Sequence, residues 1–426
     1  MVSLRALLAS IVSSPSKMTK RDGFSLLGYG GMRMPTTDGG HANSWAKEGY
    51  SASDIDQPRL NAQVKLMLDG GINVFDTSPA YCRGESERRL GEALAASGRP
   101  RESYFLSSKL SNFAKEQWSA EASKAMFEKT LENLRTDYLD VYLIHNVGGE
   151  NFENRFVRNG MLDWLFEQKR LGRIRRIGFS IHGDRPRFEW LMKQHDVGRY
   201  QWDVALIQTN YVDWHHAAKV NKRNVHAEFY YRELDRRGIR MMVMEPLLGG
   251  QLANPPEAVL RELRSLDAEA TPASWAFRFC GSHPDVLTVL SGMREEAHIR
   301  ENLATFSPLK PLTNVERVTL ERAAAEFVGF GAVPCTHCSY CMPCPYGLDI
   351  PAIFAYRNEY LVKDEGRSAK ELLALYEKAV PEELRRADHC TGCGRCRSHC
   401  PQKINIPEEI AAIDHVIDLL KDEVVK

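Results

Sequence analysis

The chain has 426 residues, with 56 Lys+Arg balanced by 56 Asp+Glu, so its formal net charge is zero. This length allows a large core and more than one domain. The balanced charge argues against a nucleic-acid-binding protein, and no run of 18 or more apolar residues is present that would predict a membrane span.

The N-terminal segment is expected to lie outside the folded domains. We interpret residues 1–20 as a leader or a disordered N-terminus, because the apolar stretch Leu4–Val12 is short and contains Arg5. An alternative is that translation starts at Met18. A cytoplasmic location is expected, because the many cysteines described below must stay reduced if they bind a metal.

Between residues 21 and 310, short apolar segments alternate with longer amphipathic ones. This rhythm predicts parallel strands joined by crossover helices, and eight such strands close a (β/α)8 TIM barrel of the α/β class. The predicted strands are Ser25–Gly30, Asn73–Thr77, Tyr104–Lys109, Asp140–His145, Arg176–Ser180, Ala205–Gln208, Arg240–Glu245 and Leu287–Ser291.

The segments between the strands carry helical periodicity. Glu121–Arg135 repeats apolar residues every three or four positions, which predicts a helix. The polar stretch Pro35–Asp56 is predicted to be a loop after the first strand. Residues 311–331 are predicted to form a helical connector whose apolar stripe is Leu320, Ala323, Ala324 and Phe327.

Eight of the ten cysteines fall in two short runs near the C-terminus. Each run has four cysteines separated by two or three residues, with a proline after the last one. This pattern is typical of ligands for [4Fe–4S] clusters. The predicted metal ligands are Cys335, Cys338, Cys341 and Cys344 in the first run, and Cys390, Cys393, Cys396 and Cys400 in the second.

Three interpretations of these runs compete. Two [4Fe–4S] clusters are favoured, zinc also accepts paired Cys-x2-Cys units, and disulfides are disfavoured in the cytosol. In proteins with two such clusters the fourth cysteine of each run binds the other cluster. Cys400 would then complete the cluster of the first run, and Cys344 that of the second; the x2 spacing before Cys344, in place of x3, leaves this assignment open.

The C-terminal segment also contains an internal repeat. In each half an Ile-Pro pair follows the cysteine run, at Ile350-Pro351 and Ile406-Pro407. Asp349 and Asn405 precede these pairs, and an Asp or Asn before an early proline is typical of a helix start. Each half is therefore predicted to be a cysteine loop that leads into a helix, with a further helix over Lys370–Val380.

Four ionisable residues fall at or just beyond the ends of three consecutive predicted strands. They are Asp76, Tyr81, Lys109 and His145. A parallel barrel gathers the carboxyl ends of its strands at one rim, where active sites of barrel enzymes lie. Tyr81 is a candidate proton donor, Lys109 is expected to lower its pKa, Asp76 to hold Lys109, and His145 to orient a substrate oxygen.

These residues and the order of the other motifs resemble the aldo/keto reductase superfamily over residues 21–310. The four ionisable residues match the catalytic tetrad of that family, and Ser86–Leu94 matches the helix that follows. With its cysteine runs, the chain resembles the bacterial subgroup that carries a C-terminal ferredoxin-type domain. Residues 332–426 are accordingly expected to form a small all-α domain similar to helical ferredoxins.

The resemblance implies NADP or NAD as the cofactor. The positions that match nicotinamide, pyrophosphate and adenosine contacts of the family are Ser180, Gln208, Pro246, Leu247, Gly249, Gly250, Gly292, Met293, Glu301 and Asn302. Ile181 replaces an Asn common in the family, and Met244 and Glu245 replace an aromatic residue. His298 and Arg294 fall where a 2′-phosphate would be bound, which mildly favours NADP.

The expected function is an oxidoreductase that transfers hydride between a nicotinamide and a small carbonyl or alcohol substrate. The cysteine-rich domain would serve electron transfer or stability. Two alternatives remain open: an electron-transfer protein that works with a redox partner, and a nicotinamide-binding redox sensor without turnover. The retained tetrad favours an enzyme, because a binding protein would not need it.

Overall fold

The structure is a computed structural model that describes residues 17–37, 55–220, 224–363, 366–380 and 386–425. Residues 1–16 of the predicted leader lie outside these ranges. So do residues 38–54 of the loop predicted after the first strand. None of the helices in the described ranges is long and apolar enough to cross a membrane.

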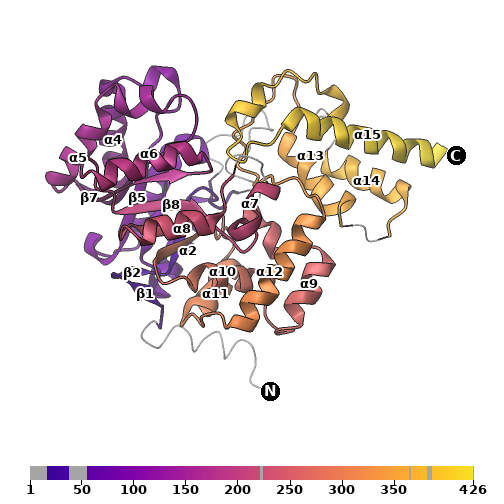
Figure 1. Cartoon of the computed structure of the whole chain (residues 1–426), viewed down its shortest axis with the longest axis horizontal. Helices are drawn as coiled ribbons and strands as arrows, with labels where there is room; N and C mark the ends of the chain where they lie inside the picture. The colour runs from indigo at the N-terminus through magenta and orange to yellow at the C-terminus, as the bar shows by residue number, and fades with distance from the viewer. Residues whose placement is uncertain (1–16, 38–54, 221–223, 364–365, 381–385, 426) are drawn as a thin grey trace.

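Eight parallel strands close a barrel, as predicted (Figure 1). Each strand pairs with its neighbours in chain order, and the last strand closes the ring against the first. The strands are β3 Leu27–Gly30, β4 Val74–Asp76, β5 Phe105–Leu110, β6 Leu139–Ile144, β7 Ile174–Ile181, β8 Val204–Gln208, β9 Arg240–Met244 and β10 Val286–Ser291.

The first predicted strand is divided in two. Phe24–Ser25 forms β2, which pairs antiparallel with β1 (Lys20–Arg21), and only Leu27–Gly30 enters the barrel. Phe24 stacks on Phe105 at a centroid distance of 3.8 Å and belongs to the cluster that fills the barrel interior. The prediction of one continuous strand was wrong here, because the alternating pattern does not reveal where the chain turns.

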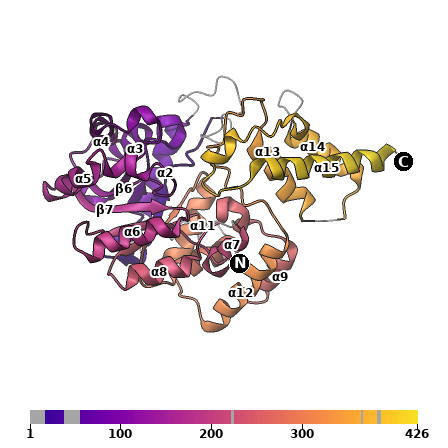
Figure 2. The same cartoon turned by 45° about the horizontal axis from the view of Figure 1, so that its top comes forward.

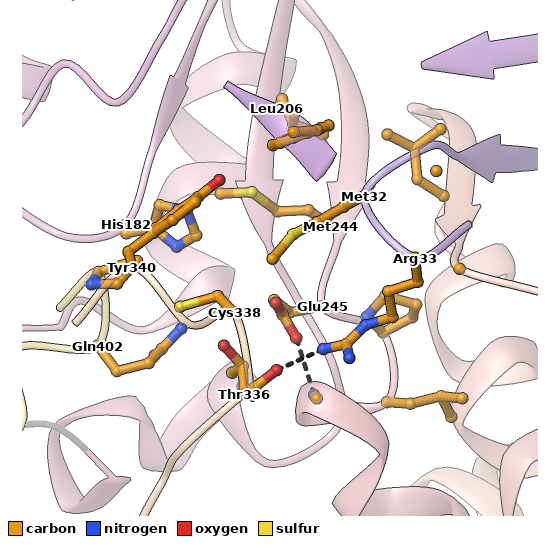
Figure 3. Close-up of a pocket in the computed structure, with 18 of the residues that line it drawn as sticks. Met32, Arg33, His182, Leu206, Met244, Glu245, Thr336, Cys338, Tyr340 and Gln402 are labelled. Carbon is orange, nitrogen blue, oxygen red and sulfur yellow. Dashed lines mark hydrogen bonds between the residues drawn. The ribbon is translucent and has the colours of Figure 1, made fainter. Parts of the chain in front are cut away.

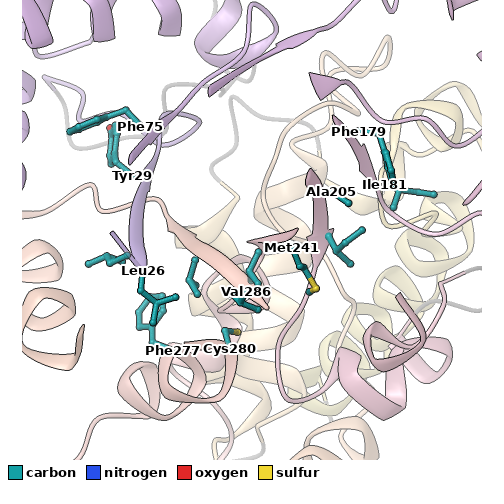
Figure 4. Close-up of a cluster of buried hydrophobic side chains, with 14 of the residues drawn as sticks. Leu26, Tyr29, Phe75, Phe179, Ile181, Ala205, Met241, Phe277, Cys280 and Val286 are labelled. Atoms are coloured by element: carbon teal, nitrogen blue, oxygen red, sulfur yellow. The ribbon is translucent and has the colours of Figure 1, made fainter. Parts of the chain in front are cut away.

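Side chains alternate between the barrel interior and the layer beneath the helices. In β8, Val204 and Leu206 belong to the inner cluster, whereas Ala205 and Ile207 belong to the outer one. Figure 4 shows part of the outer cluster, including Phe179 and Ala205 from the strands. This period of two is what a strand with both faces buried requires.

Helices surround the barrel (Figures 1 and 2). Those that follow the strands are α2 Gln57–Asp69, α3 Ser86–Ala96, α4 Ala120–Leu134, α5 Met161–Arg170, α6 Arg185–Asp196, α7 Asp213–Val220, α8 Ala227–Asp235, α9 Glu257–Arg264, α10 Pro272–Gly281 and α11 Glu296–Phe306. The predicted connector contains α12, Asn314–Gly329, which packs on α9 and α7. Its predicted apolar stripe is buried in the same cluster as the barrel helices.

Gly91 lies where α3 and α4 approach most closely, and it gives a prediction about stability. A Cβ atom on Gly91 would lie 2.2 Å from the carbonyl oxygen of Asn133. Gly91→Ala should therefore force the backbones apart and lower the free energy of unfolding by about 1–3 kcal/mol. Gly329→Ala is the control, since nothing lies within 4 Å of its Cβ position. Urea denaturation of both variants compares them, and a fully stable Gly91→Ala would contradict the packing.

The described residues of the C-terminal domain form helices joined by loops, with no β-strand among them, in line with the predicted all-α domain. Its helices are α13 Ile350–Tyr356, α14 Ala369–Ala379 and α15 Ile406–Val425. They share a separate apolar cluster that includes Ile353, Phe354 and Ile410. The predicted repeat is confirmed in outline, because a helix begins at each Ile-Pro pair, and the Asp349 carboxylate caps α13 by accepting from the Ala352 amide at 3.0 Å.

Candidate active site

The four predicted catalytic residues meet at one end of the barrel. Asp76 ends β4, Lys109 lies in β5, and His145 follows β6. Tyr81 begins the short turn Tyr81–Gly84 after β4. The rings of Tyr81 and His145 lie edge to face, 5.8 Å apart, and the Lys109 ammonium lies 4.6 Å from the Tyr81 ring centroid.

Lys109 and Asp76 form a buried ion pair behind the tyrosine. The Lys109 Nζ donates to Asp76 Oδ2 at 2.6 Å and to the Thr77 carbonyl at 2.8 Å, and Ser107 donates to the other carboxylate oxygen at 2.7 Å. Burial lowers the pKa of Lys109, and the adjacent Asp76 carboxylate opposes this. A buried charge is retained when it is paired and hydrogen-bonded in this way.

The pKa of the Tyr81 phenol differs from the prediction. Burial raises its pKa well above the usual value of 10, and the Asp76 and Glu245 carboxylates raise it further. The predicted lowering by Lys109 was wrong, because burial of the phenol dominates and the nearby Asp76 carboxylate acts in the same, raising direction. Tyr81 therefore remains a protonated phenol throughout the neutral pH range.

His145 is held by the residues around it. Its Nδ1 lies 2.6 Å from the Ser111 hydroxyl, which also contacts Ser78 at 2.8 Å. Burial lowers the pKa of His145 well below its usual value, and the cations Lys109 and Arg155 lower it further. The imidazole is therefore neutral at pH 7 and can act as a hydrogen-bond donor or acceptor.

A cavity of about 1320 Å³ opens at this end of the barrel. Asp76, Tyr81 and His145 line it, while Lys109 lies behind the wall with no exposed surface. Seven of the positions predicted to contact the cofactor also line it: Pro246, Leu247, Gly249, Gly250, Gly292, Glu301 and Asn302. The candidate catalytic groups and most of the candidate cofactor contacts therefore share one space.

The other three predicted cofactor contacts, Ser180, Gln208 and Met293, are buried and do not line the cavity. Ser180 accepts a hydrogen bond from the Asn146 amide at 2.8 Å. Gln208 is paired with Gln402 of the C-terminal domain through two amide hydrogen bonds of 3.0 and 3.2 Å. The position expected to bind the nicotinamide carboxamide is thus covered by another carboxamide.

The rest of the Gln208 amide is also engaged. Its Nε2 donates to Asp213 Oδ2 at 2.9 Å. Its Oε1 lies 3.1 Å from His182 Nδ1. An amide has two donor hydrogens and two acceptor positions, and all four are used here. A ligand can therefore bind Gln208 only by replacing one of these partners.

The glycine loop after β9 lies against the C-terminal domain. Gly249 has φ 69°, and a Cβ atom there would lie 2.4 Å from Thr336 Cα. The Gly249 amide donates to Glu245 Oε2 at 2.8 Å, and Arg33 donates to the Thr336 carbonyl (Figure 3). Gly249 is required both by its left-handed backbone and by the close approach of Thr336.

The C-terminal domain supplies one wall of the cavity. Thr336, Cys338, Tyr340 and Gln402 appear together with the barrel residues Met244 and Glu245 in Figure 3. Ser398, His399, Pro401 and Lys403 complete this wall. Tyr340 and Cys338 are near enough to Tyr81 to influence its surroundings electrostatically. The cysteine loops and the catalytic rim therefore face the same space.

Cysteines from the two runs lie near one another in the structure. Cys335, Cys338, Cys341 and Cys400 line one small cavity. Cys396 interacts electrostatically with Cys344, Cys393 and Cys390, and Cys341 interacts with Cys396 as well. The division into two cross-ligated sets stays a prediction.

The donor chemistry of these thiols fits iron–sulfur clusters, which take cysteine thiolates as ligands. Among the described residues no three His, Cys, Asp or Glu side chains are close enough to hold a single metal ion.

Several residues at the site were not identified from the sequence. Ser111 holds His145, and Tyr340, Gln402 and Lys403 come from the C-terminal domain. Arg155 lies in η5, a π-helical turn over Glu153–Val157. Of these residues only Ser111 could have been identified from the sequence, because it lies just beyond the end of a predicted strand. The others depend on how the second domain and the loop after β6 dock on the barrel.

A parallel eight-stranded barrel with this rim and a cysteine-rich helical domain defines a barrel oxidoreductase joined to an iron–sulfur domain. Residues 27–319 match the model of the aldo/keto reductase family, and residues 334–406 match that of the 4Fe-4S dicluster domain. The chain belongs to the aldo/keto reductase family and carries a C-terminal 4Fe–4S domain.

Individual relatives are distant. The chain is 30% identical to the glyoxal reductase of Bacillus subtilis over 44% of this chain and 58% of that protein. It is 26% identical to the L-galactose dehydrogenase of Arabidopsis thaliana over 62% of this chain and 82% of that protein. The match therefore spans less than two thirds of the Bacillus protein.

Solved structures agree on the barrel. An aldo-keto reductase from Bacillus halodurans matches with a TM-score of 0.54 and 22% identity, over 72% of this chain and 96% of that one. An aldo-keto reductase from Klebsiella pneumoniae in complex with NADPH matches with a TM-score of 0.53 and 20% identity, over 72% and 95%. At these identities the likeness shows the shared fold.

Proposed function

We propose that the chain is an NAD(P)-dependent oxidoreductase that interconverts a small carbonyl compound and its alcohol. The observation that carries this proposal is the meeting of Tyr81, His145 and the Lys109–Asp76 ion pair at one cavity. A bound nicotinamide would supply or accept the hydride. The side chains of this protein would bind the carbonyl group and move the proton.

In the reduction direction Tyr81 donates the proton to the substrate oxygen. The negative charge that then develops on the phenol is stabilised by the Lys109 ammonium near the ring, which Asp76 holds in place. When Ser111 donates to Nδ1 of His145, Nε2 carries the proton and donates to the same substrate oxygen. Two donors thus orient the carbonyl for attack.

For the dinucleotide, the glycine loop Pro246–Gly250 and the residues Gly292, Glu301 and Asn302 provide a wall along the cavity. Arg294 and His298 line the same cavity; Arg294 would supply positive charge and His298 a ring nitrogen for hydrogen bonding to a 2′-phosphate. The nicotinamide carboxamide would reach Gln208 by replacing the Gln402 amide, which is an exchange between chemically identical groups.

We also propose two [4Fe–4S] clusters in the C-terminal domain. Cys335, Cys338 and Cys341 with Cys400 would hold the first, next to the cavity, and Cys390, Cys393 and Cys396 with Cys344 the second. Such clusters carry single electrons. Cys335 and Cys400 are buried whereas Cys393 is exposed, which favours a route from the cavity through both clusters to a redox protein.

The proposal is tested by anaerobic purification followed by two measurements. Analysis of iron and sulfide should give about eight iron atoms per chain, four for each cluster. The oxidation of NADPH and NADH should then be followed with a panel of aldehydes and ketones. Absence of turnover with every substrate, at full cluster content, would contradict the proposed enzyme.

Electron transfer without turnover of a small carbonyl is a second candidate, favoured by the position of Cys338 in the cavity wall. Mixing the protein with NADPH in the absence of substrate distinguishes electron transfer from simple carbonyl reduction. Bleaching of the visible cluster absorbance would favour electron transfer, while unchanged absorbance together with carbonyl reduction would favour the simple reductase.

A further inference from the structure

Arg155 is a buried cation beside the candidate catalytic histidine. Its side chain is 5% exposed and lines the cavity. It donates to the carbonyl oxygens of His145 at 2.7 Å and Asn146 at 3.0 Å, and to the Asn112 amide oxygen at 3.3 Å. All three acceptors are neutral. In the described part of the chain Arg155 forms no ion pair.

A buried guanidinium without a counter-charge is costly, because the desolvation of the ion is not offset by a carboxylate. Burial lowers the pKa of Arg155 to about 10, so the group still carries its charge at neutral pH. It is held between the rings of Phe113 and Phe156, at 4.8 and 4.4 Å. It also lies in the π-helical turn η5, and such turns are frequent at functional sites.

A second cation reaches the same region from the C-terminal domain. Lys403 lines the cavity, is exposed to it, and has a left-handed backbone with φ 55°. It forms no ion pair with any described residue. Its ammonium is close enough to contribute to the low pKa of His182, about 4, although burial is the larger cause. His182 in turn influences His145.

None of the acidic groups that line the cavity forms an ion pair with Arg155 or Lys403. Asp76 is paired with Lys109, and Glu245 lies near Arg33. Glu301 accepts from Thr271, and Glu150 is exposed at the edge. Lys403 lies near Cys400 as well, so Arg155 is the cation that keeps no anionic partner at the end of the cavity where Tyr81 and His145 would bind the carbonyl group.

We propose that this end of the cavity recognises substrates that carry a carboxylate in addition to the reacting carbonyl, with Arg155 and Lys403 as the residues that bind it. Three of the five N–H groups of Arg155 are occupied by protein acceptors, which leaves two for a ligand. The planar guanidinium suits a carboxylate, and Lys403 adds a mobile point charge. The inference rests on the proposed reductase and assigns its substrate class: oxo acids and aldehyde acids.

The test compares each acid with its uncharged ester. Values of kcat/KM are measured with NADPH for glyoxylate and succinic semialdehyde and for their methyl esters. We expect the protein to favour at least one acid over its ester by tenfold or more. Lys403→Met should lower kcat/KM for that acid by at least tenfold and for the ester by less than threefold, and Arg155→Met should lower kcat/KM for the acid by at least tenfold.

Matched variants separate the charge from the fold. Lys193 and Arg158 are exposed and do not line the cavity, so Lys193→Met and Arg158→Met should keep the preference for the acid. Lys403→Arg should keep most of the preference for the acid over its ester, because the positive charge is retained. Arg155 also holds the loop at His145, so a loss of ester turnover in Arg155→Met would indicate that His145 is misplaced. In that case Lys403→Met decides whether the cavity binds a carboxylate, because Lys403 does not contact His145.

A binding measurement keeps the inference independent of turnover. Oxamate has a carboxylate but no aldehyde or ketone, and its dissociation constant from calorimetry should rise at least tenfold in Lys403→Met. If esters and acids are reduced equally well, or if oxamate binds equally to all variants, the carboxylate site is wrong although the reductase stands. If no carbonyl compound is reduced, the proposed reductase fails, and the oxamate result alone decides whether the anion site exists.

Discussion

Replacing Tyr81 with Phe is expected to lower kcat for carbonyl reduction by about 10²- to 10⁴-fold, the usual contribution of a positioned proton donor. The ring would stay in place beside Lys109 and His145, because only the hydroxyl is removed. Binding of NADPH should therefore change little. Steady-state kinetics and a fluorescence titration with NADPH measure the two effects separately.

Tyr230→Phe provides the control for that change. Tyr230 is buried in α8, does not line the cavity, and its hydroxyl has no hydrogen-bond partner among the described residues. Removing that hydroxyl should leave kcat unaltered. Equal activity of Tyr81→Phe and the unmodified protein would show that the proton comes from elsewhere, and the assignment of Tyr81 would be abandoned.

Loss of the first cluster is expected to affect the active site, whereas loss of the second is not. Cys400→Ala should reduce the iron content by about four atoms per chain and lower kcat/KM for the carbonyl substrate by at least tenfold. The physical reason is that Cys400 is two residues from Gln402, and its partners Cys335 and Cys338 flank Thr336, which packs on Gly249. These contacts form one wall of the cavity.

Cys393→Ala is the matched variant in the other group. Cys393 is exposed and does not line the cavity, so its replacement should also remove about four iron atoms while carbonyl reduction continues. Iron analysis, visible absorbance and NADPH oxidation are measured on both variants prepared anaerobically. If the two variants lose activity to the same extent, the clusters act on turnover through electron transfer and not through the shape of the cavity.

The barrel could be predicted because its signals are local. Eight apolar segments of strand length, each followed by a helical pattern, specify the architecture. The rim residues Asp76, Lys109 and His145 follow from it, since parallel strands end at one face. The iron–sulfur domain could also be predicted, because two runs of closely spaced cysteines, each followed by proline, are a local pattern, and residues 334–406 match the 4Fe-4S dicluster domain.

What could not be predicted depends on contacts between distant segments. The docking of Thr336 on Gly249 joins residues 87 positions apart, and nothing in either segment signals it. The same is true of the pair formed by Gln208 and Gln402. The pKa of Tyr81 was misjudged for a related reason: burial of the phenol raises the pKa, and the Asp76 and Glu245 carboxylates raise it further, and both effects depend on packing that a sequence does not contain.

The Gln208–Gln402 pair has a thermodynamic consequence. A molecule that replaces Gln402 at Gln208 displaces a residue only two positions from Cys400, a proposed ligand of iron. Linkage is reciprocal, so a nucleotide that alters the surroundings of that iron must shift its reduction potential, and reduction must change nucleotide affinity by the same factor. The protein would then sense the redox state of one centre as a change in occupancy at the other.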